Sequence, residues 1–242
     1  MSKQVASTRE FVWKGRTGPF SIALNPDVFT PSSTSLTLAE ALEVGAGETV
    51  LDVGCGSGVL SFVAARLAPS AFVYGCDVSE ESVATARANA RSLGLQDRME
   101  FRPGHLLDPV TDVSADVVIG DVSGIPDAIA AVTGWFPNSK GGGPTGSELP
   151  VAMLEGVRDV MRQGARLYLP TGTIQAEQPV IDAARRAFGD AMEIVVERQF
   201  PLAGEIVEHP EVTDLIDRGI VKLARRGSRF IWRLSIWRCV RR

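Results

Sequence analysis

The residues with the clearest chemical potential form an acidic, glycine-rich turn. The segment Leu51-Asp52-Val53-Gly54-Cys55-Gly56-Ser57-Gly58 follows an apolar run and precedes a helical pattern. Glycine lets the backbone turn sharply and lets a ligand approach where a Cβ atom would collide. The nicotinamide and flavin pattern G-x-G-x-x-G would require glycine at position 59, where this chain has Val59. A carboxylate at Asp52 favours a cationic ligand over an anionic pyrophosphate.

A second acid, Asp77, lies at a spacing typical of a nucleoside-binding residue. It follows Asp52 by 25 residues and ends the next apolar run, in Tyr74-Gly75-Cys76-Asp77-Val78-Ser79. A carboxylate at this place can accept hydrogen bonds from both hydroxyl groups of a ribose. The alternative interpretation is the N-cap of the following helix, because Asp is a favoured N-cap residue. Combined with the glycine turn, Asp77 favours a nucleoside cofactor.

The pattern D-x-G-x-G-x-G at 52–58 resembles motif I of the class I S-adenosylmethionine-dependent methyltransferases. The resemblance implies that S-adenosylmethionine is the cofactor, that the glycine loop passes under its amino-acid part, and that Asp52 lies near its ammonium group. The cofactor-binding residues expected from it are Thr34, Asp52, Gly54, Cys55, Gly56, Gly58, Asp77, Val78, His105, Leu106 and Asp121.

The loop Pro103-Gly104-His105-Leu106-Leu107-Asp108 follows the third strand of the predicted sheet. In the resembling family this loop usually reads G-D followed by an apolar residue, and the acid accepts a hydrogen bond from the adenine amino group. Here His105 stands at the position of that acid. A neutral imidazole can accept a hydrogen bond or stack on the ring, so we expect His105 and Leu106 to contact adenine. The alternative is a loop histidine without a role.

Asp121 is the candidate catalytic residue. The fourth strand ends in Gly120-Asp121-Val122-Ser123-Gly124, and the carboxyl ends of strands flank the ligand crevice in doubly wound folds. Family members that methylate amino groups carry N-P-P-Y or D-P-P-Y here, whereas this chain keeps only the acid. We expect Asp121 to orient or deprotonate an amine or hydroxyl acceptor. Alternatively, it holds the cofactor's amino-acid end or caps the next turn.

Two further segments resemble the glutamine-N5 and ribosomal-protein methyltransferases, the subgroup nearest in pattern. Residues 25–36 are similar to its P-R-x-E-T-E-x-L segment, and residues 141–155 are similar to its glycine-rich stretch and following helix. The tyrosine, both prolines of P-P-Y and the charged residues of the first segment are missing. The sequence therefore departs from the subgroup at the acceptor side.

Alternating strand and helix patterns predict the fold that positions these residues. Seven strands are expected, at 49–53, 71–76, 99–102, 115–119, 165–169, 192–197 and 229–239. Helices are expected at 37–42, 59–67, 80–93, 149–161 and 176–188. The alternation predicts a doubly wound, Rossmann-like α/β fold with three α/β/α layers. The resemblance to the class I methyltransferases implies that this seven-stranded, mostly parallel sheet carries its last strand antiparallel beside the fifth.

The domain organisation expected is one methyltransferase domain with a small N-terminal addition. Residues 1–34 contain two short strand patterns around Gly15-Arg16-Thr17-Gly18-Pro19 and are expected to form a hairpin that caps the substrate side. Residues 35–242 form the cofactor-binding domain, with insertions near 134–147 and 201–227.

Composition narrows the class of protein. The 242 residues carry a net charge of −4, yet Arg218 to Arg242 hold eight arginines, one lysine and no acid. Such a block could attract an anionic substrate or nucleic acid, or form a solvated face. Three scattered cysteines and two histidines predict neither a disulfide framework nor a metal site. With no apolar run long enough for a membrane span and no secretory signal, we expect a cytoplasmic protein.

These features predict methyl transfer from S-adenosylmethionine to a nitrogen or oxygen of a small-molecule acceptor, which could be anionic. The alternative is a protein-glutamine or RNA methyltransferase, with a protein or nucleic acid as partner. A non-catalytic, cofactor-binding partner subunit is a third interpretation. The oligomeric state is not predicted.

Overall fold

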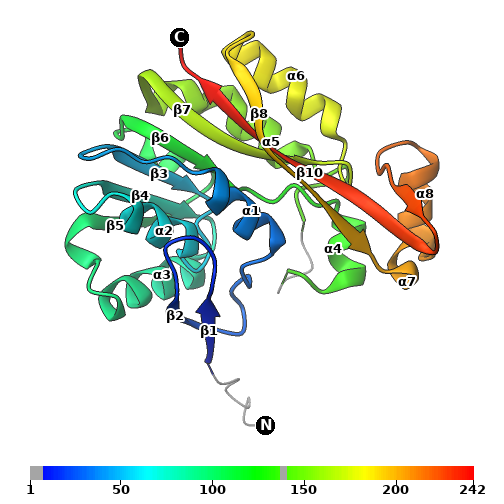
Figure 1. Cartoon of the computed structure of the whole chain (residues 1–242), viewed down its shortest axis with the longest axis horizontal. Coiled ribbons are helices and arrows are strands. Elements are labelled where there is room, and N and C mark those ends of the chain that lie inside the picture. The colour runs from blue at the N-terminus through cyan, green and yellow to red at the C-terminus, as the bar shows by residue number, and fades with distance from the viewer. Residues whose placement is uncertain (1–7, 137–140) are drawn as a thin grey trace.

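The computed structural model describes residues 8–136 and 141–242, and the chain forms one large sheet flanked by helices, with a two-stranded hairpin beside it (Figure 1). The strands are β1 (Arg9–Trp13), β2 (Phe20–Leu24), β3 (Thr49–Val53), β4 (Phe72–Asp77), β5 (Met99–Pro103), β6 (Ala115–Gly120), β7 (Met161–Gly172), β8 (Met192–Leu202), β9 (Ala224–Arg226) and β10 (Arg229–Val240). The helices are α1 (Ser33–Ala41), α2 (Val59–Leu67), α3 (Glu80–Ser92), α4 (Asp127–Thr133), α5 (Glu148–Gly156), α6 (Glu177–Phe188), α7 (Gly204–Val207) and α8 (Pro210–Asp217).

The strand order of the sheet is β5-β4-β3-β6-β7-β10-β8, and β9 pairs with the start of β10. Strands β5, β4, β3, β6 and β7 are parallel, whereas β10 runs antiparallel between β7 and β8. The predicted fold class is confirmed, including the last strand beside the fifth. The carboxyl ends of the parallel strands consequently share one edge of the sheet.

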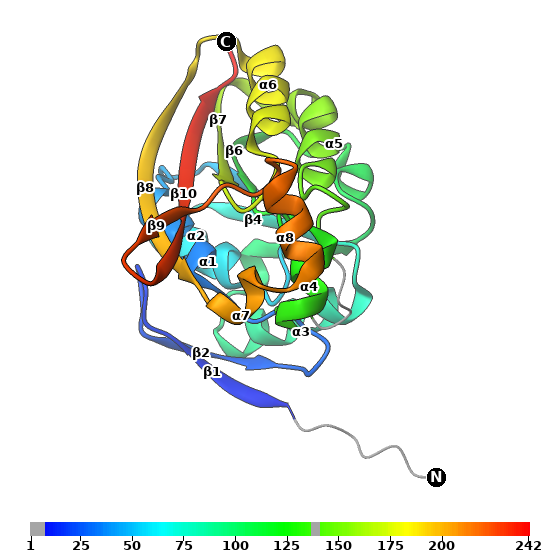
Figure 2. The same cartoon turned by 90° about the vertical axis from the view of Figure 1, so that its right-hand side faces the viewer.

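Helices cover both faces of the sheet, which gives the predicted three layers (Figure 2). Side chains alternate between the faces along each strand: Val50 and Val117 join one apolar cluster, while Leu51 and Val118 join the other. The first cluster contains the buried side chains of α1, α2 and α3, and the second contains those of α5 and α6. Burial on both faces explains why these strands read as continuous apolar runs.

The N-terminal hairpin shares the core of the large domain. Its inward side chains Trp13, Phe20, Ile22 and Leu24 are at most 6% exposed and belong to the cluster that contains α1 to α3. The side chain of Asn89 on α3 accepts a hydrogen bond from the backbone N–H of Ala23 (2.8 Å) and donates one to its carbonyl oxygen (3.0 Å). The hairpin is therefore anchored on the helix that follows Asp77.

Two details differ from the sequence predictions. The helix expected at 149–161 ends at Gly156, and a 3-10 turn at Val157–Val160 leads directly into β7, which begins at Met161. The apolar residues Val157 and Val160 are both buried in that turn, and a spacing of three residues is also typical of the buried face of a helix. The sequence pattern therefore resembles a longer helix. Helices α4, α7 and α8 and strand β9 were not predicted; α4 contacts both α7 and α8 beyond the carboxyl edge of the sheet (Figure 2).

Among the described residues, no helix has both the length and the apolar character that crossing a membrane requires.

Candidate cofactor and acceptor site

The glycine turn joins the carboxyl ends of β3 and β4. The N–H groups of Gly54 and Cys55 both donate to the carbonyl oxygen of Cys76, at 2.8 and 2.9 Å. Gly54, Gly56 and Gly58 have φ angles of 78°, 53° and 88°, which other residues rarely adopt. The three glycines are thus required by the backbone path, and Cys55 lies buried beneath them.

Asp77 closes the turn from the neighbouring strand. Its Oδ2 accepts a hydrogen bond from the N–H of Gly56, and its Oδ1 accepts one from Ser79, both at 2.9 Å. Burial raises the pKa of this carboxyl group, and the two backbone hydrogen bonds lower it. Ser79, not Asp77, is the N-cap of α3, because its side chain accepts from the N–H of Ser82. The N-cap interpretation of Asp77 is therefore excluded.

Asp52 is buried beneath the turn with one oxygen unpartnered. Its Oδ2 accepts a hydrogen bond from the Ser61 hydroxyl at 2.6 Å, while Oδ1 has no partner among the described residues. Burial raises the pKa of Asp52 to about 7, the Ser61 hydrogen bond opposes this, and repulsion from Asp121 and Asp77 adds to it. A nearby cation would stabilise the ionised form of this carboxyl group.

Asp121 lies where the end of β6 meets the glycine turn. A Cβ atom on Gly54 would lie only 3.1 Å from the backbone oxygen of Asp121, so the two segments touch. Burial raises the pKa of the Asp121 carboxyl group to about 6. The structure thus brings together Asp52, Asp77 and Asp121, three carboxylates contributed by the ends of three adjacent strands.

The loop with His105 and Leu106 lies beside Asp77, since the N–H of Gly104 donates to the Asp77 carbonyl oxygen at 2.9 Å. Leu106 has a φ of 46°, and its carbonyl oxygen accepts from the thiol of Cys76 at 3.2 Å. The His105 side chain is exposed, and so is Val78, at 72%. Both predicted nucleoside-side residues therefore present free surface next to Asp77.

Thr34 occupies the first turn of α1 and is half-buried. Its N–H donates to the N-cap hydroxyl of Ser32 at 3.2 Å, and its hydrogen bonding does not reach the glycine turn. Of the predicted cofactor residues, Thr34 is the one that the structure does not connect to the others.

Sequence reasoning missed Ser61 and Asn89, which support the turn from helices. Asn89 is 2% exposed and donates to the carbonyl oxygen of Ser57 at 3.2 Å, in addition to its hydrogen bonds to Ala23. An asparagine within an alanine-rich helix is a detectable signal, because its side chain competes with helical hydrogen bonds unless it has an outside partner. Asn89 links the hairpin and the glycine turn.

Sequence reasoning also missed Gln175, which follows β7. Gln175 is 5% exposed, and its Nε2 has no hydrogen-bond partner among the described residues; the same holds for the buried hydroxyl of Ser123. A Cβ atom on Gly124 would lie 2.4 Å from Oε1 of Gln175, so the glutamine amide lies directly against the loop after β6. Together with Asp52 and Asp121, these polar groups lie along the carboxyl edge of the sheet.

The glycine-rich segment at 141–146 supports the loop after β6 from outside. The N–H of Gly142 donates to the carbonyl oxygen of Ile125 at 2.7 Å, and the N–H of Gly141 donates to the Asp127 side chain at 2.8 Å. A Cβ atom on Gly142 would lie 2.0 Å from the Ser123 carbonyl oxygen. Glycine is needed here because the two backbones touch. Residues 137–140 of the predicted insertion lie outside the described residues.

No group of three or more His, Cys, Asp or Glu side chains suited to a metal ion occurs within residues 8–136 and 141–242.

Comparison with known protein families identifies the family to which the chain belongs. The family model described as "Methyltransferase domain" matches residues 45–211, which is more than half of the chain. The chain belongs to the methyltransferase domain family. It is thus a member of the S-adenosylmethionine-dependent methyltransferases, as the pattern at 52–58 predicts.

Two relatives illustrate the similarity in sequence. The chain is 31% identical to a release factor glutamine methyltransferase of Moorella thermoacetica over 67% of this chain and 60% of that protein. It is 28% identical to a ribosomal protein L11 methyltransferase of Shouchella clausii over 73% of this chain and 50% of that protein. The chain therefore spans only part of the length of these methyltransferases.

A solved structure illustrates the similarity in fold. The T. thermophilus 16S rRNA methyltransferase, in complex with AdoMet and guanosine, has a TM-score of 0.61 at 15% identity and covers 98% of this chain and 51% of its own. The methyltransferase fold is shared, and S-adenosylmethionine is the cofactor of the family.

The residues of this methyltransferase fit that cofactor. S-adenosylmethionine carries a sulfonium and an ammonium cation, and three carboxylates surround the turn. Apart from Gly56 and its two chain neighbours, no described residue has an atom within 4 Å of the position that a Cβ on Gly56 would take, so the turn is open on its outer side. The unpartnered Oδ1 of Asp52 supplies buried negative charge beneath it. An anionic pyrophosphate would be repelled at the same place.

Proposed function

We propose that this protein transfers the methyl group of S-adenosylmethionine to a planar nitrogen, an amide or exocyclic amino group, carried by a macromolecule. The observation that supports this proposal most is the position of Asp121, which touches the glycine turn on one side and leads to Ser123 and Gln175 on the other. A methyl donor bound at the turn and an acceptor bound at the polar groups would meet beside one carboxylate.

On the cofactor side, Asp77 would accept hydrogen bonds from the ribose hydroxyl groups through its remaining lone pairs. Asp52 would compensate the positive charge of the ligand, and Gly54, Gly56 and Gly58 would let it lie against the backbone, over the buried Cys55. The exposed Val78, with His105 and Leu106, would contact the adenine ring; Thr34 would contribute from the first turn of α1. S-adenosylmethionine supplies an already activated methyl group.

On the acceptor side, the N–H of a planar amino group would donate to the Asp121 carboxylate. When the bond between sulfur and the methyl carbon breaks and the bond from nitrogen to carbon forms, the nitrogen loses a proton, and Asp121 would accept it. A pKa of about 6 leaves this carboxyl group mostly ionised at neutral pH and able to act as a base. The Gln175 amide and the Ser123 hydroxyl would hold the acceptor's oxygen or ring nitrogens.

The small-molecule acceptor that the sequence first suggested is not supported by the comparisons, which favour the alternative. The relatives by sequence are named for a release factor glutamine and for ribosomal protein L11, and the related structure is named for 16S rRNA. All three are macromolecules. We propose that the hairpin at the N-terminus, the described residues of the insertion near 134–147 (134–136 and 141–147) and the insertion 201–227 surround the acceptor side of the site and admit a protein chain or a nucleic-acid strand.

A labelled-methyl assay tests the proposal. Purified protein is incubated with S-adenosylmethionine labelled in the methyl group and with separate protein, RNA and metabolite fractions. We expect label in a macromolecular fraction, and we expect the Asp77→Ala variant to leave that fraction unlabelled. Label confined to the metabolite fraction would refute the macromolecular acceptor, and equal labelling by Asp77→Ala would refute the cofactor site.

A further inference from the structure

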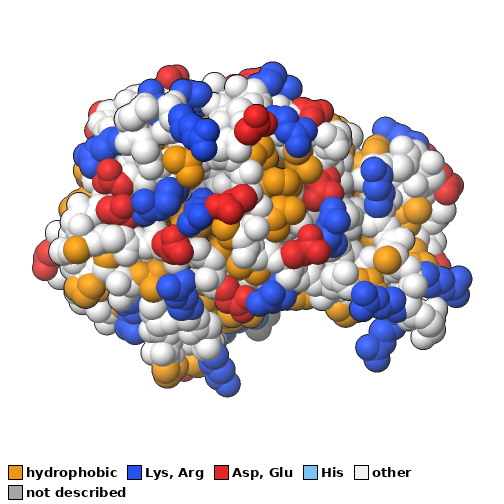
Figure 3. All heavy atoms as spheres, turned by 45° about the horizontal axis from the view of Figure 1, so that its top comes forward, with side chains coloured by type: hydrophobic (Ala, Val, Ile, Leu, Met, Phe, Trp, Pro, Cys, Tyr) orange, Lys and Arg blue, Asp and Glu red, His pale blue; other side chains and the backbone are white. Residues whose placement is uncertain are grey.

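The basic C-terminal block predicted from the sequence divides into two structurally different parts. One part is the arm, defined here as residues 222–231, which contains β9, the turn at Gly227 and the start of β10. Its four basic side chains, Lys222, Arg225, Arg226 and Arg229, are all exposed. None of them forms an ion pair with an acid among the described residues. Figure 3 shows several basic side chains at the lower right of the molecule, where β9 and β10 meet.

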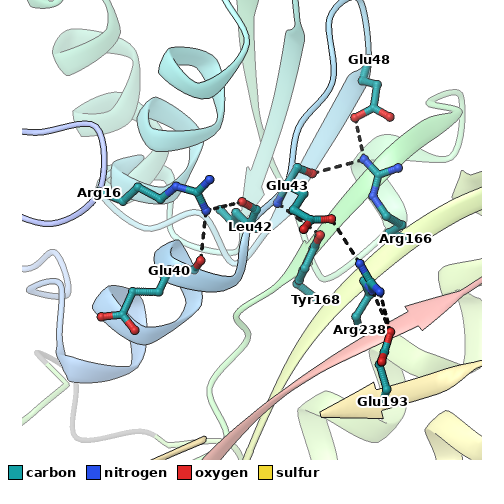
Figure 4. Close-up of polar contacts among 9 residues, drawn as sticks. All are labelled: Arg16, Glu40, Leu42, Glu43, Glu48, Arg166, Tyr168, Glu193 and Arg238. Atoms are coloured by element: carbon teal, nitrogen blue, oxygen red, sulfur yellow. Dashed lines mark hydrogen bonds and ion pairs between the residues drawn. The ribbon is translucent and has the colours of Figure 1, made fainter. Parts of the chain in front are cut away.

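Elsewhere in the block, three arginines are paired with acids: Arg218, Arg233 and Arg238. Near the opposite end of β10, Arg238 forms ion pairs with Glu193 at 2.5 Å and Glu43 at 3.2 Å (Figure 4). Closer to the arm, Arg233 pairs with Glu177 at 3.1 Å. Acids thus pair with Arg233 and Arg238 of β10, whereas no acid among the described residues pairs with the arm. The arm therefore gathers four exposed basic side chains that have no acid partner among the described residues.

The pairing of β9 with β10 brings like charges together. Arg226 lies directly opposite Arg229, and Arg225 lies opposite Phe230. Like charges directly opposite on paired strands destabilise the pair. The guanidinium group of Arg225 lies 5.7 Å from the centre of the Phe230 ring. The repulsion between Arg226 and Arg229 at this exposed tip would be relieved by a bound external anion.

The arm is rooted at the acceptor side of the site. The N–H of Lys222 donates a hydrogen bond to the carbonyl oxygen of Thr173 at 2.7 Å. The N–H of Thr173 in turn donates to the carbonyl oxygen of Arg233 at 2.9 Å. Thr173 lies two residues before Gln175, the buried amide beside the loop after β6. A concavity of about 320 Å³ lies at this root, with Lys222 and Arg233 in its lining.

We propose that the arm binds the phosphate backbone of a single-stranded nucleic acid and directs it to the acceptor crevice. Three arginines offer planar guanidinium groups, which match phosphate oxygens in bidentate geometry. Cations beside an aromatic ring are typical of surfaces that bind single strands, because bases stack while phosphates pair. Outside Arg218 to Arg242 the chain has a net charge of −13, so a polyanion is repelled elsewhere and oriented toward the arm.

This inference deepens the proposed function and rests on it for its catalytic meaning: the acceptor nitrogen would belong to a nucleobase. Binding itself is independent of methyl transfer, so the two can fail separately.

Fluorescence anisotropy with a short labelled RNA strand of mixed sequence, and with the DNA strand of the same sequence, tests the arm. The test variant is Arg225→Ala/Arg226→Ala/Arg229→Ala. The control variant is Arg91→Ala/Arg185→Ala/Arg186→Ala, which removes the same charge from exposed helical positions. We expect the test variant to bind at least about tenfold more weakly and to lose about one unit of salt slope per phosphate contact. The control variant should bind as the wild type does.

Several results would overturn the proposal: no binding by the wild type, equal loss in both variants, or displacement of the strand by polyglutamate at equal charge concentration, which would indicate an acidic protein partner. Stronger binding of RNA or of DNA identifies which nucleic acid is preferred, and either result supports the phosphate surface. Calorimetry with S-adenosylmethionine on the test variant should give the wild-type affinity. Nucleic-acid binding without cofactor binding would refute the proposed function and leave the surface standing.

Discussion

The cofactor side and the acceptor side of the sheet are built in different ways. On the cofactor side, Asp52 and the three glycines lie within seven residues, and Asp77 follows on the neighbouring strand. On the acceptor side, Ser123, Gln175 and Lys222 come from segments far apart in the chain and meet through β6, β7 and the arm. The cofactor side is acidic, and most of its residues come from one short segment of the sequence. The acceptor side is assembled by the tertiary fold and ends in the basic arm, whose side chains have no acid partner among the described residues.

Asp121 lies where the two sides meet, and its substitution should have the largest effect. Asp121→Asn keeps the size of the side chain and removes the base, so we expect methyl transfer to fall by about 10²- to 10⁴-fold. The dissociation constant of S-adenosylmethionine should change little, because Asp52 and Asp77 remain. Single-turnover kinetics with labelled methyl groups and calorimetry measure the two quantities. Full turnover by the variant would assign Asp121 to the cofactor side alone.

Trp13 tests whether the hairpin belongs structurally to the cofactor side. The indole is 1% exposed within the cluster formed with α1 to α3. Trp13→Ala should lower the free energy of unfolding by about 3–5 kcal/mol, as measured by denaturant titration. Val12→Ala, at a position 44% exposed on the same strand, is the control and should change it by less than about 0.5 kcal/mol. Equal small effects would mean that the hairpin does not contribute to the core.

These two predictions also mark how far sequence reasoning reaches. The seven strands, the glycine turn and Asp77 were predictable because a short segment of sequence is enough to identify each of them, by its hydrophobic period or by its turn residues. Ser61 and Gln175 were not, because their partners are supplied by other segments. Asn89 stands out in its alanine-rich helix, but the sequence does not show that its partners are the hairpin and the glycine turn. The short helices α7 and α8 lie in the insertion 201–227, and α4 lies just before the insertion at 134–147; none has an apolar period long enough to distinguish helix from loop.

The acidity of the cofactor side predicts a dependence on pH. The pKa values of Asp52 and Asp121 are raised to about 7 and about 6 from an ordinary value of 3.8. In this window the folded chain without ligand holds protons that the unfolded chain has released, so its stability should fall as the pH rises from about 4 to about 7. Differential scanning calorimetry of the cofactor-free protein would show the midpoint decreasing.

The binding of the cationic cofactor should depend on pH in the opposite direction, because it requires the ionised form of the Asp52 carboxyl group. The affinity for S-adenosylmethionine should rise with pH, by at most about tenfold per unit for each proton released, and level off above about 7. Asp52→Asn should flatten this profile. An affinity independent of pH in the wild type would show that the Asp52 carboxyl group does not interact with the charge of the ligand.

Substitution of Gln175 should have the smallest effect of these variants, and it tests the acceptor side most specifically. Gln175→Leu removes a buried amide whose Nε2 has no hydrogen-bond partner in the part of the chain that the structure describes, so we expect the free energy of unfolding to be unchanged or raised by up to about 1 kcal/mol. The KM for the acceptor should nevertheless rise by roughly tenfold, the equivalent of one lost hydrogen bond, at constant affinity for the cofactor. A loss of stability without a change in KM would assign Gln175 to packing.

The most direct test of the account is calorimetric titration of the purified chain with S-adenosylmethionine, beside the Gly56→Arg variant. The turn has open space over Gly56, so the arginine side chain would occupy the place of the ligand rather than the core. We expect one binding site per chain in the wild type and a loss of about 100-fold or more in the variant, or about 2.7 kcal/mol. No binding by the wild type, or equal binding by a variant that circular dichroism shows to be folded, would contradict the assignment of the cofactor to this turn.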